Sequence, residues 1–253
     1  MSELLLECKD LSLSYHTPDG EIPVISHMNF SIYKGEFVSI VGPSGCGKST
    51  LLNLLTNLLS PEEGTITIHG DFDAKNAFGY MLQQDHLFEW YDIWKNICIG
   101  PQINKSLTPE CEEYLQDLLK RYGLIEFKHK RPSELSGGMR QRAAIIRTLA
   151  MKPELLYLDE PFSSLDYQNR LNAADDIGRI IQTEGKTAVL VTHDIGEAIS
   201  LSSRILVLSK RPTTIKKEFT LPFRERGLSP LEIRNSKEFG SYFNAIWKEL
   251  NKP

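Results

Sequence analysis

Two glycine-rich segments and one pair of acidic residues carry the side chains of this sequence that could do chemistry. The first segment reads SIVGPSGCGKST over residues 39–50, after apolar residues and before the helix-like LLNLL. This is the strand, G-x-x-x-x-G-K-S loop and helix of a phosphate-binding loop, or P-loop. Its glycines let successive backbone N–H groups turn toward an anion, and a helix N-terminus adds positive potential. The segment is therefore predicted to bind a nucleotide.

Single residues of the P-loop have distinct predicted roles. Lys48 is expected to reach the β- and γ-phosphates, and the Ser49 hydroxyl to bind Mg²⁺. The residues expected to line the nucleotide are Gly42, Pro43, Ser44, Gly45, Cys46, Gly47, Lys48, Ser49 and Thr50. A glycine-rich turn without a ligand is the alternative, but it leaves the filled consensus positions and the flanking strand and helix unexplained.

The acidic pair ends a second apolar stretch, LLYLDE, at residues 155–160. Ligands of open parallel sheets bind at the carboxyl ends of the strands, where Asp159 and Glu160 would lie. Asp159 is predicted to hold Mg²⁺ through water. Glu160 is predicted to be the general base for the attacking water, a contribution of about 10²–10⁴-fold. A turn that merely starts a helix is the alternative, and the P-loop makes it the weaker interpretation.

The second glycine-rich segment, ELSGGMRQRAAIIRTLAM, begins at residue 134. Ser136 is a typical N-cap residue, so the helix after it would begin with free N–H groups beside Gly137 and Gly138. This is a second anion site, which the P-loop does not need for its own phosphates. We expect it to hold the γ-phosphate of a nucleotide bound by another copy of the chain. A capped amphipathic helix with a purely structural role is the alternative, but it does not explain the two glycines.

Composition and charge argue against several classes of protein. The chain has 253 residues, with 29 Lys+Arg, 33 Asp+Glu and a formal charge of -4, so no nucleic-acid-binding tail is indicated. No apolar run approaches the roughly 18 residues of a membrane span. The N-terminus MSELLLECKD is unlike a signal peptide. The 4 cysteines lack CxxC spacing, so reduced thiols in a cytosolic protein are expected.

The order of apolar stretches predicts an α/β fold. Alternation with period two predicts a strand-rich region before about residue 82, which contains the P-loop and its helix. Residues 84–150 are predicted to be helical, and the apolar strands and helices after them predict a mainly parallel core sheet. Residues 221–253 form a helical tail that should pack back on the protein. We expect one domain, residues 1–253.

The second glycine-rich segment resembles the signature of the ATP-binding cassette (ABC) family, LSGGQ, with Met139 in place of the glutamine. The form LSGGMRQR is similar to one importer branch. The resemblance implies a P-loop NTPase cassette with an N-terminal antiparallel β subdomain, an inserted helical subdomain at about residues 84–150, and ATP and Mg²⁺ as cofactors. It also implies a glutamine that contacts Mg²⁺ and the attacking water, a histidine at the γ-phosphate, an aspartate that crosses a dimer interface and an aromatic ring on adenine. These are Gln83 (with Gln84 as rival), His193, Asp166 and Tyr15.

The resemblance implies a mechanism in which two cassettes bind head to tail. Each P-loop faces the Ser136 segment of the other copy across ATP, and hydrolysis opens the pair. Because every motif is intact, a homodimer is expected. The implied work is transport, since apolar residues follow Gln83 where the family docks a membrane subunit. They are Leu87, Phe88, Trp90, Tyr91, Ile93 and Trp94, and their alternative role is the core of the helical subdomain.

The segments LSGGMRQR, HLFEW and VLVTHDIGEAISLSSRILVLSKRPTTI look like the nitrate, sulfonate and taurine branch of importers. Glu89 and Ser203 depart from the proline and aspartate usual there. The resemblance implies an ATPase subunit at the cytoplasmic face of the cell membrane, bound to integral membrane permease subunits. A solute-binding protein would be an indirect partner, and no nucleic acid is expected. The solute stays open. The alternative is a soluble ABC ATPase acting on DNA or the ribosome, a class with long coiled-coil insertions or two cassettes per chain.

Overall fold

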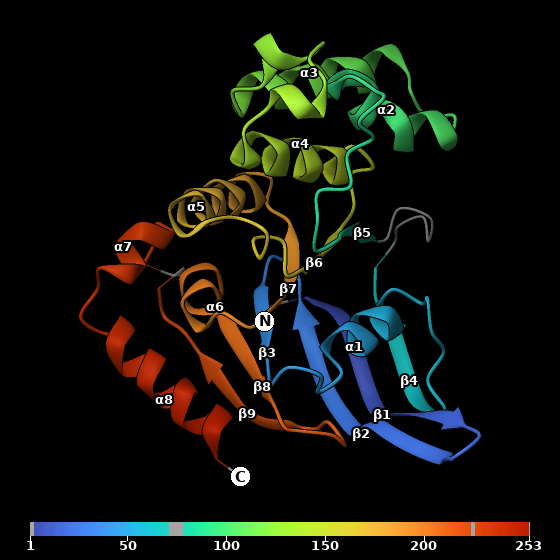
Figure 1. The fold of residues 1–253 in the computed structure, drawn as a ribbon, viewed down its shortest axis with the longest axis vertical. Helices are drawn as coiled ribbons and strands as arrows, with labels where there is room; N and C mark the ends of the chain where they lie inside the picture. The colour runs from blue at the N-terminus through green and yellow to red at the C-terminus, as the bar shows by residue number, and fades with distance from the viewer. Residues whose placement is uncertain (1–2, 71–77, 224–225, 253) are drawn as a thin grey trace. The chain divides into compact units, whose positions relative to one another are not determined.

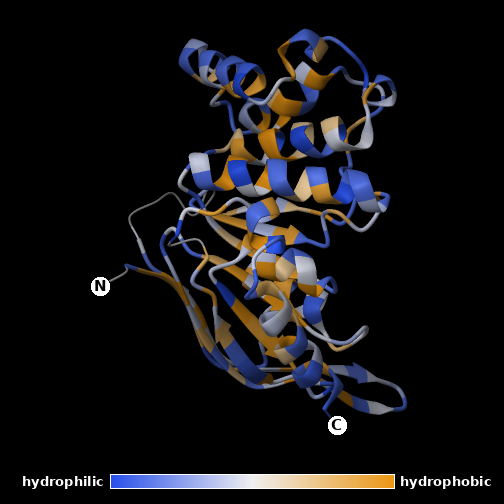
Figure 2. Ribbon diagram, turned by 90° about the vertical axis from the view of Figure 1, so that its left-hand side faces the viewer, coloured by the Kyte–Doolittle hydropathy of each residue, from blue (hydrophilic) through white to orange (hydrophobic). Residues whose placement is uncertain are grey.

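The computed structural model describes residues 3–70, 78–223 and 226–252. The chain forms two compact units, one from Met1–Phe72 with Gly185–Pro253 and the other from Asp73–Glu184. Figure 1 labels the helices and strands of both units. In Figure 2 the helices alternate between orange and blue, as expected where each helix buries one face.

An antiparallel sheet opens the first unit. Its central strand, β1, pairs antiparallel with β2 on one side and with β4 on the other. The bounds are β1 Leu4–Thr17, β2 Gly20–Tyr33 and β4 Glu63–Ile68. Buried residues alternate with more exposed ones in the second half of β2, which is the pattern of a sheet with one face against a core. The predicted antiparallel β region is confirmed.

The same unit contains strands that pair mainly in parallel. Strand β3 lies between β7 and β8 and is parallel to both, while β9 pairs antiparallel with β8. The bounds are β3 Phe37–Val41, β7 Thr187–Thr192, β8 Arg204–Leu208 and β9 Ile215–Thr220. All residues of β3 and β7 are buried, as expected for parallel strands covered on both faces. The carboxyl end of β3 leads into the P-loop.

The helices of the first unit include the C-terminal tail. They are α1 Lys48–Leu55, α6 Ile195–Leu201, α7 Pro230–Arg234 and α8 Phe239–Asn251. One buried cluster joins Ile199 of α6, Ile205 of β8, Ile233 of α7 and Ile246 of α8. The tail therefore packs back on its unit, as predicted, with two helices. Residues 224–225 and 253 of the predicted tail lie outside the described residues.

The second unit combines a parallel pair of strands with helices. Strands β5 Phe78–Met81 and β6 Leu155–Asp159 pair in parallel. The helices are α2 Ile93–Ile103, α3 Pro109–Arg121, α4 Gly137–Leu149 and α5 Tyr167–Thr183. Each begins after a side-chain N-cap, respectively Asp92, Thr108, Ser136 and Asp166. Such caps satisfy backbone N–H groups that lack a partner within the helix.

The predicted fold class is confirmed: an α/β protein with mainly parallel strands, an antiparallel β region and a helical part. The boundaries of the helical subdomain and the single-domain organisation stay predictions. Within the described ranges, every helix is too short or too polar to traverse a lipid bilayer.

Candidate functional site

The P-loop joins β3 to α1 in the first unit. Gly45 and Gly47 have φ values of 73° and 118°, in the left-handed region that favours glycine. A Cβ added at Gly47 would lie 2.7 Å from Cγ1 of Val24, so this position has no room for a side chain. Gly47 is the N-cap of α1, and no side chain of the described residues caps this end. The predicted strand, loop and helix are all present, in a form that suits anion binding.

Lys48 and Thr50 are polar residues buried in this loop, with exposed fractions of 7% and 9%. The Nζ of Lys48 donates to the carbonyl oxygens of Gly42 at 3.0 Å and Pro43 at 3.1 Å. The ammonium therefore lies inside the curl of the loop. A buried ammonium needs oxygen partners, and phosphate oxygens are partners of the same kind. The residues present thus fit the phosphates of a nucleotide.

Two more predicted site residues lie in the first unit. The hydroxyl of Tyr15 lies 3.4 Å from Oγ1 of Thr50, which places Tyr15 beside the first turn of α1, and its side chain is 41% exposed. His193 follows β7, whose last residue pairs with Val41, the last residue of β3. The exposed His193 and the P-loop therefore start from the same edge of the sheet, and the structure brings both to one end of this unit.

The acidic pair follows β6 in the second unit. The hydroxyl of Tyr80 donates to Oδ2 of Asp159 at 3.2 Å. Burial, with a smaller effect of the Asp159 carboxylate, raises the pKa of Tyr80, so the phenol stays a neutral donor. The sequence analysis did not identify this tyrosine. Its position on β5, which pairs with β6, is the feature that could have indicated a contact with Asp159. Asp159 is a single carboxylate at a strand end, a donor type that suits Mg²⁺.

Glu160 has an unusual backbone. Its φ is 43°, a left-handed value that is uncommon for residues other than glycine. Ser163 holds this conformation, because its N–H and its hydroxyl both donate to the carbonyl oxygen of Glu160, at 3.1 and 3.0 Å. Strained backbones of this kind cluster at functional sites. The strain agrees with a role for Glu160 beyond starting a turn.

The second glycine-rich segment begins α4 as predicted. The hydroxyl of Ser136 accepts the N–H of Met139 at 3.4 Å. A Cβ on Gly137 would lie 2.8 Å from Cδ2 of Leu165, so packing alone explains the first glycine. A Cβ on Gly138 would meet nothing within 4 Å. Packing within the described structure therefore does not explain the second glycine, and Gly138 leaves open space at the helix N-terminus.

The remaining predicted residues of the second unit lie on its surface. Gln83 and its rival Gln84 follow β5 and are both exposed. Asp166 is the N-cap of α5, where its carboxylate accepts the N–H of Asn169 at 3.1 Å. This bond and a second one from the Asn169 side chain hold the pKa of Asp166 below its usual range. Asp166 therefore has a structural role in addition to the predicted one.

The apolar residues after Gln83 divide between core and surface. Leu87 and Ile93 are 5% and 0% exposed, whereas Trp90 is 68% exposed. Phe88 is partly buried, and the centroid of its ring lies 5.0 Å from that of Trp90. We call residues 85–92 the docking loop. Part of the expected apolar set is core, and Trp90 is its exposed tip.

Three polar residues that sequence reasoning missed hold the docking loop. Asn96, fully buried in α2, accepts the N–H of Phe88 at 2.7 Å and donates to the carbonyl oxygens of the loop. Arg140 and Arg147 of α4 bind it from another side: Arg140 pairs with Asp85 and Glu89, and Arg147 donates to two backbone carbonyls. A buried asparagine on an apolar helix face is the one signal that the sequence offers.

The family of the chain is identified by its similarity to known proteins. The sequence model described as ABC transporter matches residues 25–163. An uncharacterized ABC transporter ATP-binding protein of Bacillus subtilis, YtlC, is 45% identical over 94% of this chain and 92% of its own length. The taurine import ATP-binding protein TauB of Roseobacter denitrificans is 35% identical over 96% of this chain and 94% of its own length. The relative TauB agrees with the branch predicted from LSGGMRQR.

A solved structure shares the fold. It is the ATP-binding cassette MJ0796 in a dimeric post-hydrolysis state bound to ADP and Pi. The two chains superpose with a TM-score of 0.70 at 31% identity, over 86% of this chain and 99% of that one. The predicted family is confirmed. The chain belongs to the ABC transporter family, whose ATP-binding proteins couple ATP hydrolysis to transport.

Proposed function

We propose that this chain is the ATPase subunit of an importer for a small solute of the nitrate, sulfonate or taurine type. It would bind permease subunits at the cytoplasmic face of the cell membrane, and a solute-binding protein would deliver the solute to the permease. The observation that carries the transport assignment is the exposed Trp90, 68% exposed at the tip of a loop fixed by buried polar contacts. The taurine import relative supports the solute class.

The nucleotide chemistry rests on a few residues. Lys48 would bind the β- and γ-phosphates, and the N–H groups of the P-loop would hold the remaining charge. Tyr15 would stack on adenine and His193 would contact the γ-phosphate. Glu160 would take the proton of the attacking water. Mg²⁺, held by Ser49, Asp159 and Gln83, would supply positive charge to the phosphates.

The catalytic form would be a homodimer. The open space at Gly138 and the helix N-terminus that begins after Ser136 suit a phosphate that the chain's own P-loop does not hold. A second copy would present its nucleotide there, with Asp166 at the interface. The relative MJ0796 has been solved as a dimer, which supports this arrangement.

Mixing two inactive variants tests the shared sites. Ser136→Arg should block one anion site and Lys48→Ala the P-loop, so each variant alone should be inactive. In a mixed dimer one composite site keeps both intact partners, and ATP hydrolysis should return to part of the wild-type rate. If mixing restores no activity while both variants are folded and dimeric, the sites are not shared.

The permease assignment is tested by two exposed tryptophans. Trp90 of the docking loop is 68% exposed and Trp247 of α8 is 57% exposed, so Trp247→Ala is a matched control for Trp90→Ala. Affinity purification from detergent-solubilised membranes should recover a permease with wild type and Trp247→Ala but not with Trp90→Ala. All three should hydrolyse ATP equally when purified alone. Recovery of DNA or ribosomes instead of a permease would support the alternative class.

An apolar groove in the second unit extends the proposed docking surface. It has a volume of about 360 Å³ and is lined by residues of β5, α2 and α4, such as Tyr80 and Ile103, and by Met151 just after α4. Ile103 lines this groove and is 73% exposed, and Leu82, which follows β5 outside the groove lining, is 42% exposed. Such exposed apolar anchors suit a helix that lies in a groove. The expected occupant is a short helix of the permease.

A further inference from the structure

The loop that joins β8 to β9, residues 209–214, lies against the P-loop within the first unit. Its contact residue is Thr213, which is completely buried. The Thr213 hydroxyl donates a hydrogen bond to the carbonyl oxygen of Cys46, inside the P-loop. Thr213 is not one of the predicted nucleotide-binding residues.

This hydrogen bond fixes one peptide unit of the P-loop. The carbonyl of Cys46 and the N–H of Gly47 belong to the same trans peptide, so they point in opposite directions. A carbonyl held toward Thr213 therefore turns the N–H of Gly47 to the other side. Gly47 needs this restraint because glycine has no Cβ and can adopt many backbone conformations besides its φ of 118°. On its other side Gly47 is confined by Val24, whose Cγ1 would lie 2.7 Å from an added Cβ.

Thr213 is itself held in place from β2. Its N–H donates to the carbonyl oxygen of Val24 at 2.8 Å, and its carbonyl oxygen accepts the N–H of Ser26 at 3.1 Å. Backbone bonds on both sides leave the side chain little freedom. The hydroxyl therefore binds Cys46 from a rigid support, which is the property that a positioning group needs.

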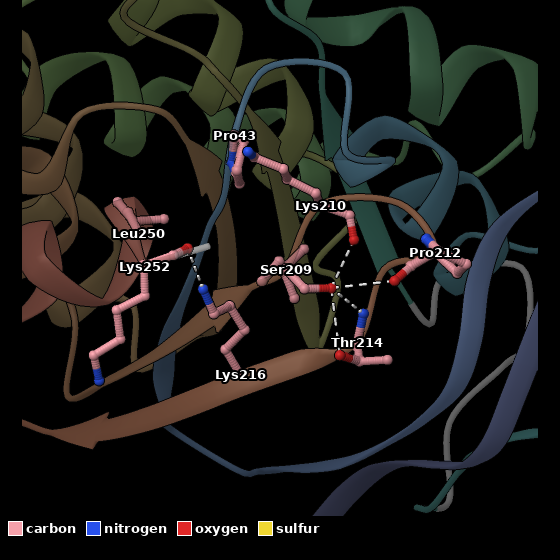
Figure 3. Close-up of a pocket in the computed structure, with 9 residues that line it drawn as sticks. Pro43, Ser209, Lys210, Pro212, Thr214, Lys216, Leu250 and Lys252 are labelled. Carbon is pink, nitrogen blue, oxygen red and sulfur yellow. Dashed lines mark hydrogen bonds between the residues drawn. The ribbon is translucent and has the colours of Figure 1, made fainter.

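Ser209 organises the rest of the loop, as Figure 3 shows. Its hydroxyl oxygen lies 2.8 Å from the carbonyl oxygen of Lys210 and 3.2 Å from that of Pro212, so one proton serves two acceptors. The same oxygen accepts the N–H of Thr214 at 2.9 Å. Pro43 of the P-loop lines the same cavity of about 320 Å³ as these loop residues. The loop is thus a folded element and not a loose connection.

We infer that Thr213 is a positioning residue for the nucleotide: its hydroxyl orients the 46–47 peptide so that the Gly47 N–H faces the phosphates. The inference rests on the proposed binding of nucleotide by the P-loop. Thr213 acts through this peptide and touches neither the nucleotide nor the attacking water. Its loss should therefore weaken nucleotide binding and leave the bond-breaking step unchanged.

The test compares three threonine variants. Thr213→Val removes the hydroxyl but keeps the branched shape, and Thr213→Ser keeps the hydroxyl. Thr56→Val is the matched control, because the buried Thr56 hydroxyl also donates to a backbone carbonyl, that of Leu52, at the far end of α1. Calorimetry gives the Kd for ADP, steady-state kinetics give KM and kcat for ATP, and thermal melting gives stability.

Thr213→Val is expected to raise the Kd for ADP and the KM for ATP about tenfold, the size of one hydrogen bond to a fixed group, with kcat within about twofold. Thr213→Ser should restore both constants. Thr56→Val should lower the melting temperature similarly and leave both constants unchanged. If Thr213→Val does not fold, Ser209→Ala replaces it, with an expected weakening of about threefold.

Two results would overturn the inference. One is wild-type affinity in Thr213→Val, or in Ser209→Ala where that variant is used. The other is an equal loss of affinity in Thr56→Val, which would mean that general destabilisation is the cause. Lys48→Ala separates the inference from the proposed function. If it binds ADP normally, the P-loop is not the nucleotide site and both fail; if it loses binding while Thr213→Val does not, only the Thr213 inference fails.

Discussion

The guanidinium of Arg140 holds the carboxylate of Asp85 with two hydrogen bonds, from Nε to Oδ2 at 2.8 Å and from Nη2 to Oδ1 at 2.9 Å. Arg140 lies on α4, two residues after Gly138 of the second glycine-rich segment, and Asp85 begins the docking loop. The same guanidinium binds Glu89, 2.7 Å away. Glu89, which replaces the proline usual in the importer branch, therefore has an ion-pair partner. The helix that begins at the predicted γ-phosphate site thus directly holds the predicted permease contact.

This ion pair predicts a pH-dependent stability. Burial would raise the pKa of Asp85, but the bonds from Arg140 and from the Leu87 N–H lower it overall. A lowered pKa gives stability that is present above the unfolded value of about 3.9 and lost as the pH falls through the folded value. Asp85→Asn should lower the free energy of unfolding by about 1–3 kcal/mol at pH 7. The difference from wild type should shrink below about pH 4.

Urea unfolding of both proteins at pH 7 and at pH 3 measures this difference. The control is Asp117→Asn, because Asp117 also pairs with an arginine, Arg121 at 2.8 Å, but its side chain is 54% exposed. It should cost less than about 1 kcal/mol. A difference that is constant with pH would show that the Asp85 charge is not the cause.

Glu160→Gln should leave nucleotide binding intact and reduce ATP hydrolysis by about 10²–10⁴-fold, because an amide cannot accept the proton of water. The variant should also accumulate as an ATP-bound dimer, measured by size-exclusion chromatography. Glu154→Gln is the control, since Glu154 lies just before the other end of β6. Unchanged turnover in Glu160→Gln would remove this residue as the base.

Gly138→Ala separates structure from function at the second glycine-rich segment. No atom lies within 4 Å of an added Cβ, and alanine favours a helix over glycine by about 1 kcal/mol. The variant should be at least as stable as wild type in thermal melting but should lose hydrolysis, because the methyl group would occupy the open space meant for the partner's nucleotide. Full activity would indicate that the space is not used.

Thiol labelling should distinguish one cysteine. Cys8, Cys46 and Cys98 are buried, whereas Cys111 is partly exposed. Burial raises the pKa of Cys46, and that of Cys98 to about 12, so few of these thiols are reactive thiolates near pH 8. Mass spectrometry after brief iodoacetamide treatment should find Cys111 labelled first, and Cys111→Ser should label slowly throughout. Equally fast labelling of Cys46 would contradict the burial of the P-loop thiol.

Features that depend on neighbouring residues were predictable from the sequence. The P-loop needs only its glycines, its lysine and the flanking apolar residues, and its strand and helix are confirmed. A threonine followed by a proline is likewise a common start of a helix; Thr108 and Pro109 begin α3, where the Thr108 hydroxyl accepts the N–H of Cys111. The strained backbone of Glu160 was not predictable, because it depends on how β6 meets the following turn.

Features that depend on distant partners were not predictable. Asp85 and Arg140 are 55 residues apart, and Cys46 and Thr213 are 167 apart. Serine, threonine and arginine at such positions also occur on any solvated surface, so their types carry no signal without the fold. The family resemblance supplied Gln83, His193, Asp166 and Tyr15, and their catalytic roles stay predictions.

The close packing of Leu165 on Gly137 has a consequence for how two chains would recognise each other. Leu165 directly precedes Asp166, and its Cδ2 would lie only 2.8 Å from a Cβ on Gly137. The start of α4 and the aspartate before α5 therefore cannot shift independently. A partner chain would therefore contact them as one rigid surface. A bulkier residue at position 137 would require a smaller residue at position 165 to restore that surface.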